Sequence, residues 1–326
     1  MQRRTLFATP LLAAPLLRGR PAAAQGWPDR PITMVVPFAP GGSPDIAARI
    51  LAPRMSELLG QPVAVENRSG AGSTIGTRSV IQARPDGNTV LMGSISIMMA
   101  PLAMDPVPFD TAASLRAISL LATVPYILVV RADAPPRDLA GFHEWARANG
   151  GKLNYGSSGT GTPLHMGGVL YSLMMGVELT HVAYRGTGPA MADLLAGQVQ
   201  MVFGDLPGVM PHIRSGAVRP LASLVKREVP ELPGVPPMSG SDPRLAEYEV
   251  YTWTLLSGPK ATPDLPVQKL HAAMVTAARE PGLAARLAEM GFVPVLNSPP
   301  EADAFLAAEQ AKWGDIIRRA GVRAEL

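Results

Sequence analysis

Short apolar, β-branched runs alternate with amphipathic stretches along most of this sequence, and this alternation limits the possible folds more than any other feature. Runs typical of buried strands lie at residues 32–36, 63–65, 89–92, 127–130, 179–183 and 201–203. Between them, stretches such as residues 46–59 and 139–148 place apolar side chains at helical spacing. Strands that alternate with helices build β/α units, so the sequence predicts an α/β protein with mostly parallel sheets.

Two glycine-rich turns have the pattern of a strand, a turn and a helix start. The first, PFAPGGSPDIAAR, spans Pro37 to Arg49, and the second, LNYGSSGTGTPLHMGG, spans Leu153 to Gly168. Glycines let a ligand approach the backbone, and the amide groups at a helix start attract anions. In open α/β sheets such turns lie at the carboxyl ends of the strands, where crevices form. These residues alone leave three possibilities open: the turns bind a phosphate, a carboxylate or no anion.

The first 24 residues have the features of an export signal. Arg3 and Arg4 precede an apolar stretch over residues 6–17, and three alanines at residues 22–24 suit a signal peptidase. The paired arginines predict a twin-arginine signal, with an ordinary secretory leader as the alternative. No internal segment reaches the roughly 18 uninterrupted apolar residues that a membrane-spanning helix needs.

Composition excludes several classes of protein. The 326 residues are 47% hydrophobic and 17% charged, which is typical of a globular chain long enough for two domains. The leader holds four arginines and no acids; without it, 25 basic residues stand against 26 acidic ones, a net charge of −1. This balance gives no indication of nucleic acid as a partner. The sequence contains no cysteine, which excludes disulfides and a thiol nucleophile.

The common catalytic and cofactor motifs are also missing. No glycine run is followed by the lysine of a P-loop, and Leu164 occupies the last glycine position of a dinucleotide fingerprint in the second turn. The five histidines form no metal-binding pair at helical spacing. Ser158 and His165 lie near each other, but YGSSG does not satisfy the G-x-S-x-G pattern of hydrolases. We therefore expect no catalytic residues, no metal and no cofactor.

From Trp27 to the C-terminus, the chain resembles the Bug-type (TctC-like) periplasmic solute-binding receptors of tripartite tricarboxylate transporters. The resemblance is carried, in the family's order and spacing, by WPDRPITMVVPFAPGGSPDIAARIL, GQPVAVENRSGAG, PDGNTVLMGS, LNYGSSGTG, HVAYRGTGPAMADLLAGQV, LPGVMPHIRSGAVRPLA and EQAKWGDII. It implies a two-lobed clamshell of the periplasmic-binding-protein type (Venus flytrap, type II), with a ligand cleft between the lobes. Lobe 1 would comprise residues 27–123 and 252–326, and lobe 2 residues 124–251.

The resemblance also implies a function. An exported, periplasmic and monomeric receptor would capture a small carboxylate, either an organic acid or an amino acid, and deliver it to a membrane permease. Two alternatives stay open: a role in presenting the ligand to a sensor, and an exported hydrolase on a clamshell fold. The two glycine turns would face each other and meet the carboxylate mainly with neutral donors. The candidate ligand-binding residues come from these two turns and from the ends of strands. They are Phe38, Gly41, Gly42, Ser43, Asp45, Ser94, Ser157, Ser158, Gly159, Thr160, Gly161, Thr162, His165, Tyr184 and Asp205.

The sequence departs from the family pattern at three places. Ser73 and Thr74 stand where Gly-Asn is usual, and Trp253 is followed by Thr-Leu instead of Tyr-Gly. The acid that commonly follows Phe203 is displaced by Gly204 to Asp205. Because side chains alternate along a strand, this displacement leaves open whether Asp205 faces the cleft. We therefore favour a ligand whose main charge is a carboxylate over an amino acid.

Overall fold

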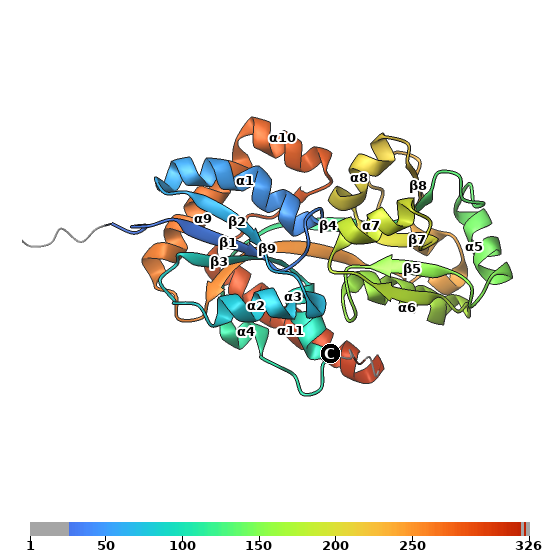
Figure 1. The fold of residues 1–326 in the computed structure, drawn as a ribbon, viewed down its shortest axis with the longest axis horizontal. Helices are drawn as coiled ribbons and strands as arrows, with labels where there is room; N and C mark the ends of the chain where they lie inside the picture. The colour runs from blue at the N-terminus through green and yellow to red at the C-terminus, as the bar shows by residue number, and fades with distance from the viewer. Residues whose placement is uncertain (1–25, 321–322, 324–326) are drawn as a thin grey trace, which may run out of the picture.

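The computed structural model describes residues 26–320 and residue 323. The predicted export signal, residues 1–24, lies outside the described residues. Figure 1 shows two α/β lobes side by side, joined by strands that run from one into the other. None of the helices in the described part has both the length and the apolar character needed to cross a bilayer.

The lobe that contains the N-terminal strand, called lobe 1 from here on, has a mixed sheet in the order β2-β1-β3-β9-β4. Its strands are β1 (Ile32–Val36), β2 (Val63–Asn67), β3 (Thr89–Ser94), β9 (Tyr251–Pro259), the first part of β4 (Leu115–Arg131) and the short β10 (Val293–Pro294). β1 runs parallel to β2 and β3, whereas β9 runs antiparallel to β3 and β4. Its helices are α1 (Ser43–Leu59), α2 (Thr74–Ile81), α3 (Ser96–Leu102), α4 (Thr111–Ser114), α9 (Asp264–Arg279), α10 (Pro281–Glu289), α11 (Pro299–Ala320) and the turn η1 (Ala71–Ser73).

Lobe 2, the other half of the molecule, continues the same sheet in the order β4-β7-β5-β6, with β8 also paired to β4. Its strands are β5 (Asn154–Ser157), β6 (Thr180–Ala183), β7 (Met201–Asp205) and β8 (Val218–Ser223). Its helices are α5 (Leu139–Ala148), α6 (Pro163–Met175), α7 (Thr187–Leu195), α8 (Leu206–Arg214) and the turns η2 (Met238–Gly240) and η3 (Pro243–Leu245). β5 is parallel to β6 and β7, and β4 is antiparallel to β7 and β8.

The strand β4 belongs to both lobes. Over residues 115–125 it pairs with β9, and from Tyr126 onward it pairs with β7 and β8. The change of partner falls at Pro125, a residue without an N–H to donate to a ladder. The prediction of mostly parallel sheets was therefore wrong: the sheet is mixed, because β4 and β9 pass between the lobes in opposite directions.

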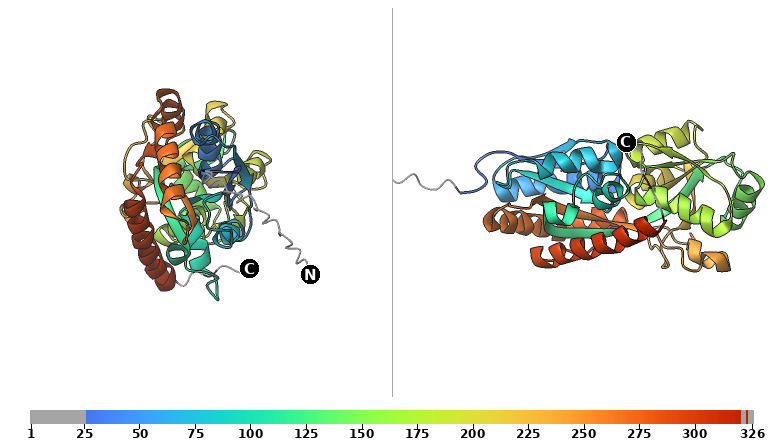
Figure 2. Two further views of the ribbon diagram at one scale, coloured as in Figure 1. Left: turned by 90° about the vertical axis from the view of Figure 1, so that its left-hand side faces the viewer. Right: turned by 90° about the horizontal axis from the view of Figure 1, so that it is seen from below.

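Strand alternation divides the core into layers on the two faces of the sheet. In lobe 1, Met34 packs toward α1 and α9, whereas its neighbour Val35 packs toward α3 and α11. In lobe 2, Leu128 packs toward α5 and α6, whereas Val129 packs toward α7 and α8. Seen from below, α11 lies along lobe 1 (Figure 2). Both faces are thus covered by helices, as an open α/β sheet requires.

Trp253 on β9 is fully buried in lobe 1. Its indole Nε1 donates to Glu309 Oε2 of α11 at 3.0 Å, and its ring meets Phe305 edge-on with ring centroids 5.7 Å apart. The side chain thereby fastens α11 to the strand that enters from lobe 2.

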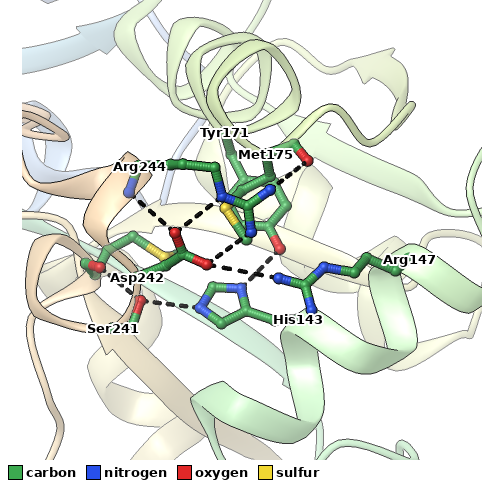
Figure 3. Close-up of polar contacts among 8 residues, drawn as sticks. His143, Arg147, Tyr171, Met175, Ser241, Asp242 and Arg244 are labelled. Carbon is green, nitrogen blue, oxygen red and sulfur yellow. Dashed lines mark hydrogen bonds and ion pairs between the residues drawn. The ribbon is translucent and has the colours of Figure 1, made fainter.

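A polar cluster holds the chain segment around η2 and η3 onto lobe 2 (Figure 3). The Ser241 hydroxyl donates to the Met238 carbonyl at 2.7 Å, so it accepts from His143 Nε2 at 2.9 Å. His143 Nδ1 then accepts from the Tyr171 hydroxyl at 2.9 Å. This arrangement requires a neutral imidazole, and burial lowers the pKa of His143 accordingly.

Beside this histidine, Asp242 forms a two-point ion pair with Arg244 (Figure 3). Arg244 Nε and Nη2 lie 2.9 and 2.7 Å from its two oxygens, and Arg147 lies 3.6 Å away. Hydrogen bonds from Arg244 hold the pKa of Asp242 well below its usual range. All of these partners are used within lobe 2, so the cluster fixes a loop.

Candidate ligand-binding site

The first glycine turn connects β1 to α1 and is braced from within. Gly41 has a φ of 102°, a conformation that favours glycine, and its N–H donates to Asp45 Oδ2 at 3.1 Å. Asn67 Nδ2 donates to the Phe38 carbonyl and to Asp45 Oδ1, both at 2.9 Å. Arg49 Nε also donates to Asp45 Oδ1, at 3.0 Å. The carboxylate of Asp45 therefore supports the loop from within.

The second glycine turn connects β5 to α6. The Gly159 N–H donates to Ser157 Oγ at 3.1 Å, and the Thr162 hydroxyl donates to the Gly159 carbonyl at 2.6 Å. Thr162 is the N-cap of α6, with Pro163 as the first helical residue. The Gly161 N–H donates to His165 Nδ1 at 3.2 Å. These bonds fix the turn and leave Ser158 directed at the space between the lobes.

The two lobes touch directly around these turns. The Ala39 N–H of lobe 1 donates to the Arg185 carbonyl of lobe 2 at 2.9 Å. A Cβ placed on Gly159 would lie 3.2 Å from the Cα of Gly72, and one placed on Gly188 would lie 2.2 Å from the Pro40 carbonyl oxygen. Only glycines permit backbones to approach this closely. The lobes are therefore closed onto each other.

A small polar cavity lies between the turns. It offers about 20 Å³ to the centre of a water molecule, which is room for about one water. The lining residues come from both lobes: Phe38, Gly42, Ser43, Pro44, Ser94, Ser96, Tyr126, Ser158, Leu164, Thr187 and Asp205. Six of these residues carry a hydroxyl group, and none is a lysine or arginine. In this conformation the site presents neutral donors around one acid.

That acid, Asp205, bridges the lobes. It ends β7 and is 2% exposed. One carboxylate oxygen accepts from the Ser43 N–H, the first amide of α1, and the other accepts from the Thr187 hydroxyl of α7. Burial raises the pKa of Asp205, and the hydrogen bonds from Thr187 and Ser43 oppose that rise. A carboxylate of lobe 2 thus sits at the helix start in lobe 1.

The structure brings together part of the predicted residue set. Phe38, Gly42, Ser43, Ser94, Ser158 and Asp205 line the cavity. Seven further candidates belong to the two turns: Gly41, Asp45, Ser157, Gly159, Gly161 and Thr162 shape the turns, and Thr160 places its carbonyl against Gly72. Tyr184 lies farther along, where its hydroxyl donates to Asp193 Oδ2 at 2.7 Å.

Five lining residues lay outside the sequence prediction: Pro44, Ser96, Tyr126, Leu164 and Thr187. Thr187 lies within the glycine turn YRGTG, at the start of α7, so the sequence carried a local signal for a third helix start. Tyr126 lies within the long apolar run of β4 and gave no such signal, because only the change of strand partner turns it toward the cavity.

Two histidines stack behind the second turn. His165 and His181 have ring centroids 4.0 Å apart, and Ser157 Oγ lies 2.6 Å from His181 Nε2. Burial lowers the pKa of His165 to about 4 and that of His181 to about 3, the latter with a contribution from His165. The Ser157 side chain is fully buried. This serine and histidine therefore support the turn, and the pairing of Ser158 with His165 that a hydrolase would need does not form.

Acid is expected to destabilise the second turn. Both histidines are neutral when folded, whereas in the unfolded chain they titrate near pH 6.5. Below about pH 6.5 the unfolded chain binds protons that the folded chain does not. The free energy of unfolding therefore decreases as the pH is lowered. Between neutral pH and about pH 4.5, we expect the free energy of unfolding to fall by about 2 kcal/mol less in His165→Gln than in wild type.

Urea unfolding at both pH values measures this difference, with His212→Gln on α8 as the matched control. An equal loss of stability in His165→Gln and wild type would contradict the role given to the stacked pair.

Among the described residues, no group of three or more potential ligands could hold a metal ion. The cavity has the chemistry of a binding site, with helix starts and hydroxyls from two lobes that meet across it. Fold and site together define a two-lobed solute-binding protein of the periplasmic-binding-protein type.

Comparison with known proteins gives the family. Residues 47–322 match the family model described as the tripartite tricarboxylate transporter family receptor (TctC). The chain is 33% identical over 308 residues to Protein BugT of Bordetella pertussis, covering 93% of each chain. This protein belongs to the TctC/Bug family of periplasmic solute-binding proteins, as its resemblance predicted.

Solved structures agree with this assignment. The periplasmic binding protein BugD has a TM-score of 0.87 at 34% identity, covering 92% of this chain and all of its own. MatC from Rhodopseudomonas palustris, with bound malate, has a TM-score of 0.83 at 31% identity and covers 89% of this chain and all of its own. Rpa4515 of the same organism, with adipate, has a TM-score of 0.86 at 31% identity and covers 92% of this chain and all of its own.

Proposed function

We propose that this protein is an extracytoplasmic receptor that captures a small carboxylate between its lobes. The observation that carries the proposal is the cavity between two helix starts, lined by hydroxyls and free of lysine and arginine among its lining residues. Charge-assisted hydrogen bonds contribute roughly 1.5 to 3 kcal/mol each, so a few of them approach the about 8 kcal/mol of micromolar binding. Neutral donors bind a carboxylate and still release it when the lobes open.

The relatives support this class of ligand. MatC is described with malate and Rpa4515 with adipate, and both are dicarboxylates. The family description supports delivery to the permease of a tripartite transporter. We propose that the receptor acts as an exported monomer without enzymatic activity, and that residues 1–24 are its export signal.

Binding requires the lobes to separate. The closed cavity has room for about one water molecule, far less than a dicarboxylate needs. We propose that residues 27–123 with 252–326, and residues 124–251, rotate as two bodies. Support comes from the change of partner of β4 at Pro125 and Tyr126, where the sheet of one lobe passes into that of the other.

Native mass spectrometry of the protein purified without denaturation tests the proposal. We expect a co-purified ligand that carries a carboxylate, and a titration with that compound should give a Kd of about 1 μM or below. Turnover of the ligand, or the absence of binding by every carboxylate in a broad panel, would contradict the proposal.

A further inference from the structure

The start of α1 is a helix terminus whose donors are few. Pro44 at the second helical position has no N–H, so the helix start offers the amides of the N-cap Gly42, Ser43 and Asp45. The Ser43 N–H is the one taken by Asp205, which approaches from lobe 2. When the lobes are closed, the start of α1 therefore already donates to a carboxylate of the protein itself, that of Asp205.

Both carboxylate oxygens of Asp205 accept hydrogen bonds, which favour its ionised form and oppose the burial that raises its pKa. A backbone N–H can only donate, and the second carboxylate oxygen accepts from the Thr187 hydroxyl. Each oxygen keeps a further lone pair, and Asp205 also lines the cavity. None of the lining residues carries a positive charge that would offset a second anion beside it.

The opposite side of the cavity differs. There Ser158 and Leu164, from the second turn and the first helical turn of α6, face the cavity. The imidazole behind this turn, His165, accepts from the Gly161 N–H and is neutral. The cavity thus has a side without an acid, at α6, and a side already occupied by one, at α1.

We propose that the ligand binds with its carboxylate at the α6 side and directs a hydrogen-bond donor, a hydroxyl or ammonium group, at Asp205. This inference rests on the proposed function and specifies its ligand class. A plain dicarboxylate would place a second anion against Asp205, and like charges brought together at a closed interface cost several kcal/mol. A donor would instead use the acceptor capacity that Ser43 and Thr187 leave on the carboxylate.

Titration calorimetry with compounds matched in chain length tests the inference. Succinate, γ-hydroxybutyrate and γ-aminobutyrate share one carboxylate and differ only at the other end, and longer and shorter homologues are compared in the same way. At the chain length that binds most tightly, we expect wild type to bind the hydroxy or amino compound at least ~10-fold more tightly than the dicarboxylate. Whichever of the two binds more tightly distinguishes a hydroxyl from an ammonium donor.

The isosteric variant Asp205→Asn removes the charge and keeps an acceptor for Ser43. We expect it to tighten dicarboxylate binding by ~10-fold or more and to weaken binding of an amino compound. Asp133→Asn, which removes an exposed carboxylate of lobe 2 outside the cavity lining, serves as the control and should retain the order of preference. A dicarboxylate preference in wild type, or an unchanged ratio in Asp205→Asn, would overturn this inference alone. Failure of all carboxylates to bind would overturn the proposed function as well.

Discussion

Gly188→Ala is expected to weaken ligand binding by roughly 10- to 100-fold while the protein remains folded. Gly188 is the second residue of α7 in lobe 2, where alanine suits the helix better than glycine. The added Cβ would lie 2.2 Å from the Pro40 carbonyl oxygen in lobe 1 and 3.7 Å from the Gly41 Cα. This collision arises only when the lobes close, so the variant disfavours the closed conformation by about 1–3 kcal/mol.

Gly282→Ala is the matched control for this experiment. Gly282 is also the second residue of a helix, α10, and a Cβ there would meet nothing within 4 Å. Titration calorimetry and thermal melting of the two variants separate an effect on closure from an effect on folding. Unaltered affinity in Gly188→Ala would show that the ligand does not require the contact between α7 and the first turn.

Ser158→Leu is expected to reduce ligand affinity at least ~100-fold, or about 2.7 kcal/mol. The serine is 8% exposed and lines the cavity from the second turn, so a leucine there removes a hydroxyl and fills the space that the ligand enters. The hydrogen bond from the Gly159 N–H to Ser157 Oγ, which helps to fix the turn, involves only its neighbours. We therefore expect the unfolding temperature to change little.

Ser158→Ala separates the two causes, because it removes the hydroxyl without adding bulk. A charge-assisted hydrogen bond is worth roughly 1.5 to 3 kcal/mol, so this variant should lose ~10-fold or more. Ser215→Leu, at the exposed end of α8, controls for an added leucine. If Ser158→Leu binds as tightly as wild type, the second turn is not part of the ligand site.

Local patterns in the sequence predicted the β/α units and both glycine turns. Each of the six apolar runs coincides with a strand or part of one, apart from Leu179, which precedes β6, since β-branched residues flanked by turns are recognisable without tertiary information. The crossing strands were harder to predict. β4 covers 17 residues, of which the sequence indicated only residues 127–130, because a strand buried on both faces shows no alternation.

The cavity shows the same limit. Ser43 and Ser158 were predicted because glycine turns before helices carry a local signal. Tyr126 was missed because its position depends on pairing with Asp205 across a sheet, between residues far apart in the chain. The direction of the Asp205 side chain also depended on tertiary structure: the displacement by Gly204 left it open, and the structure turns it toward α1.

The paired strands β4 and β9 have a consequence for how fast a captured ligand is secured. These two strands connect the lobes and keep the two glycine turns close together. The second turn is therefore present at a high effective concentration around any ligand bound to the first. The second contact is then an intramolecular event, whose rate does not depend on the amount of receptor. A longer connection between the lobes would lower this effective concentration and the apparent affinity, even with every residue of the cavity unchanged.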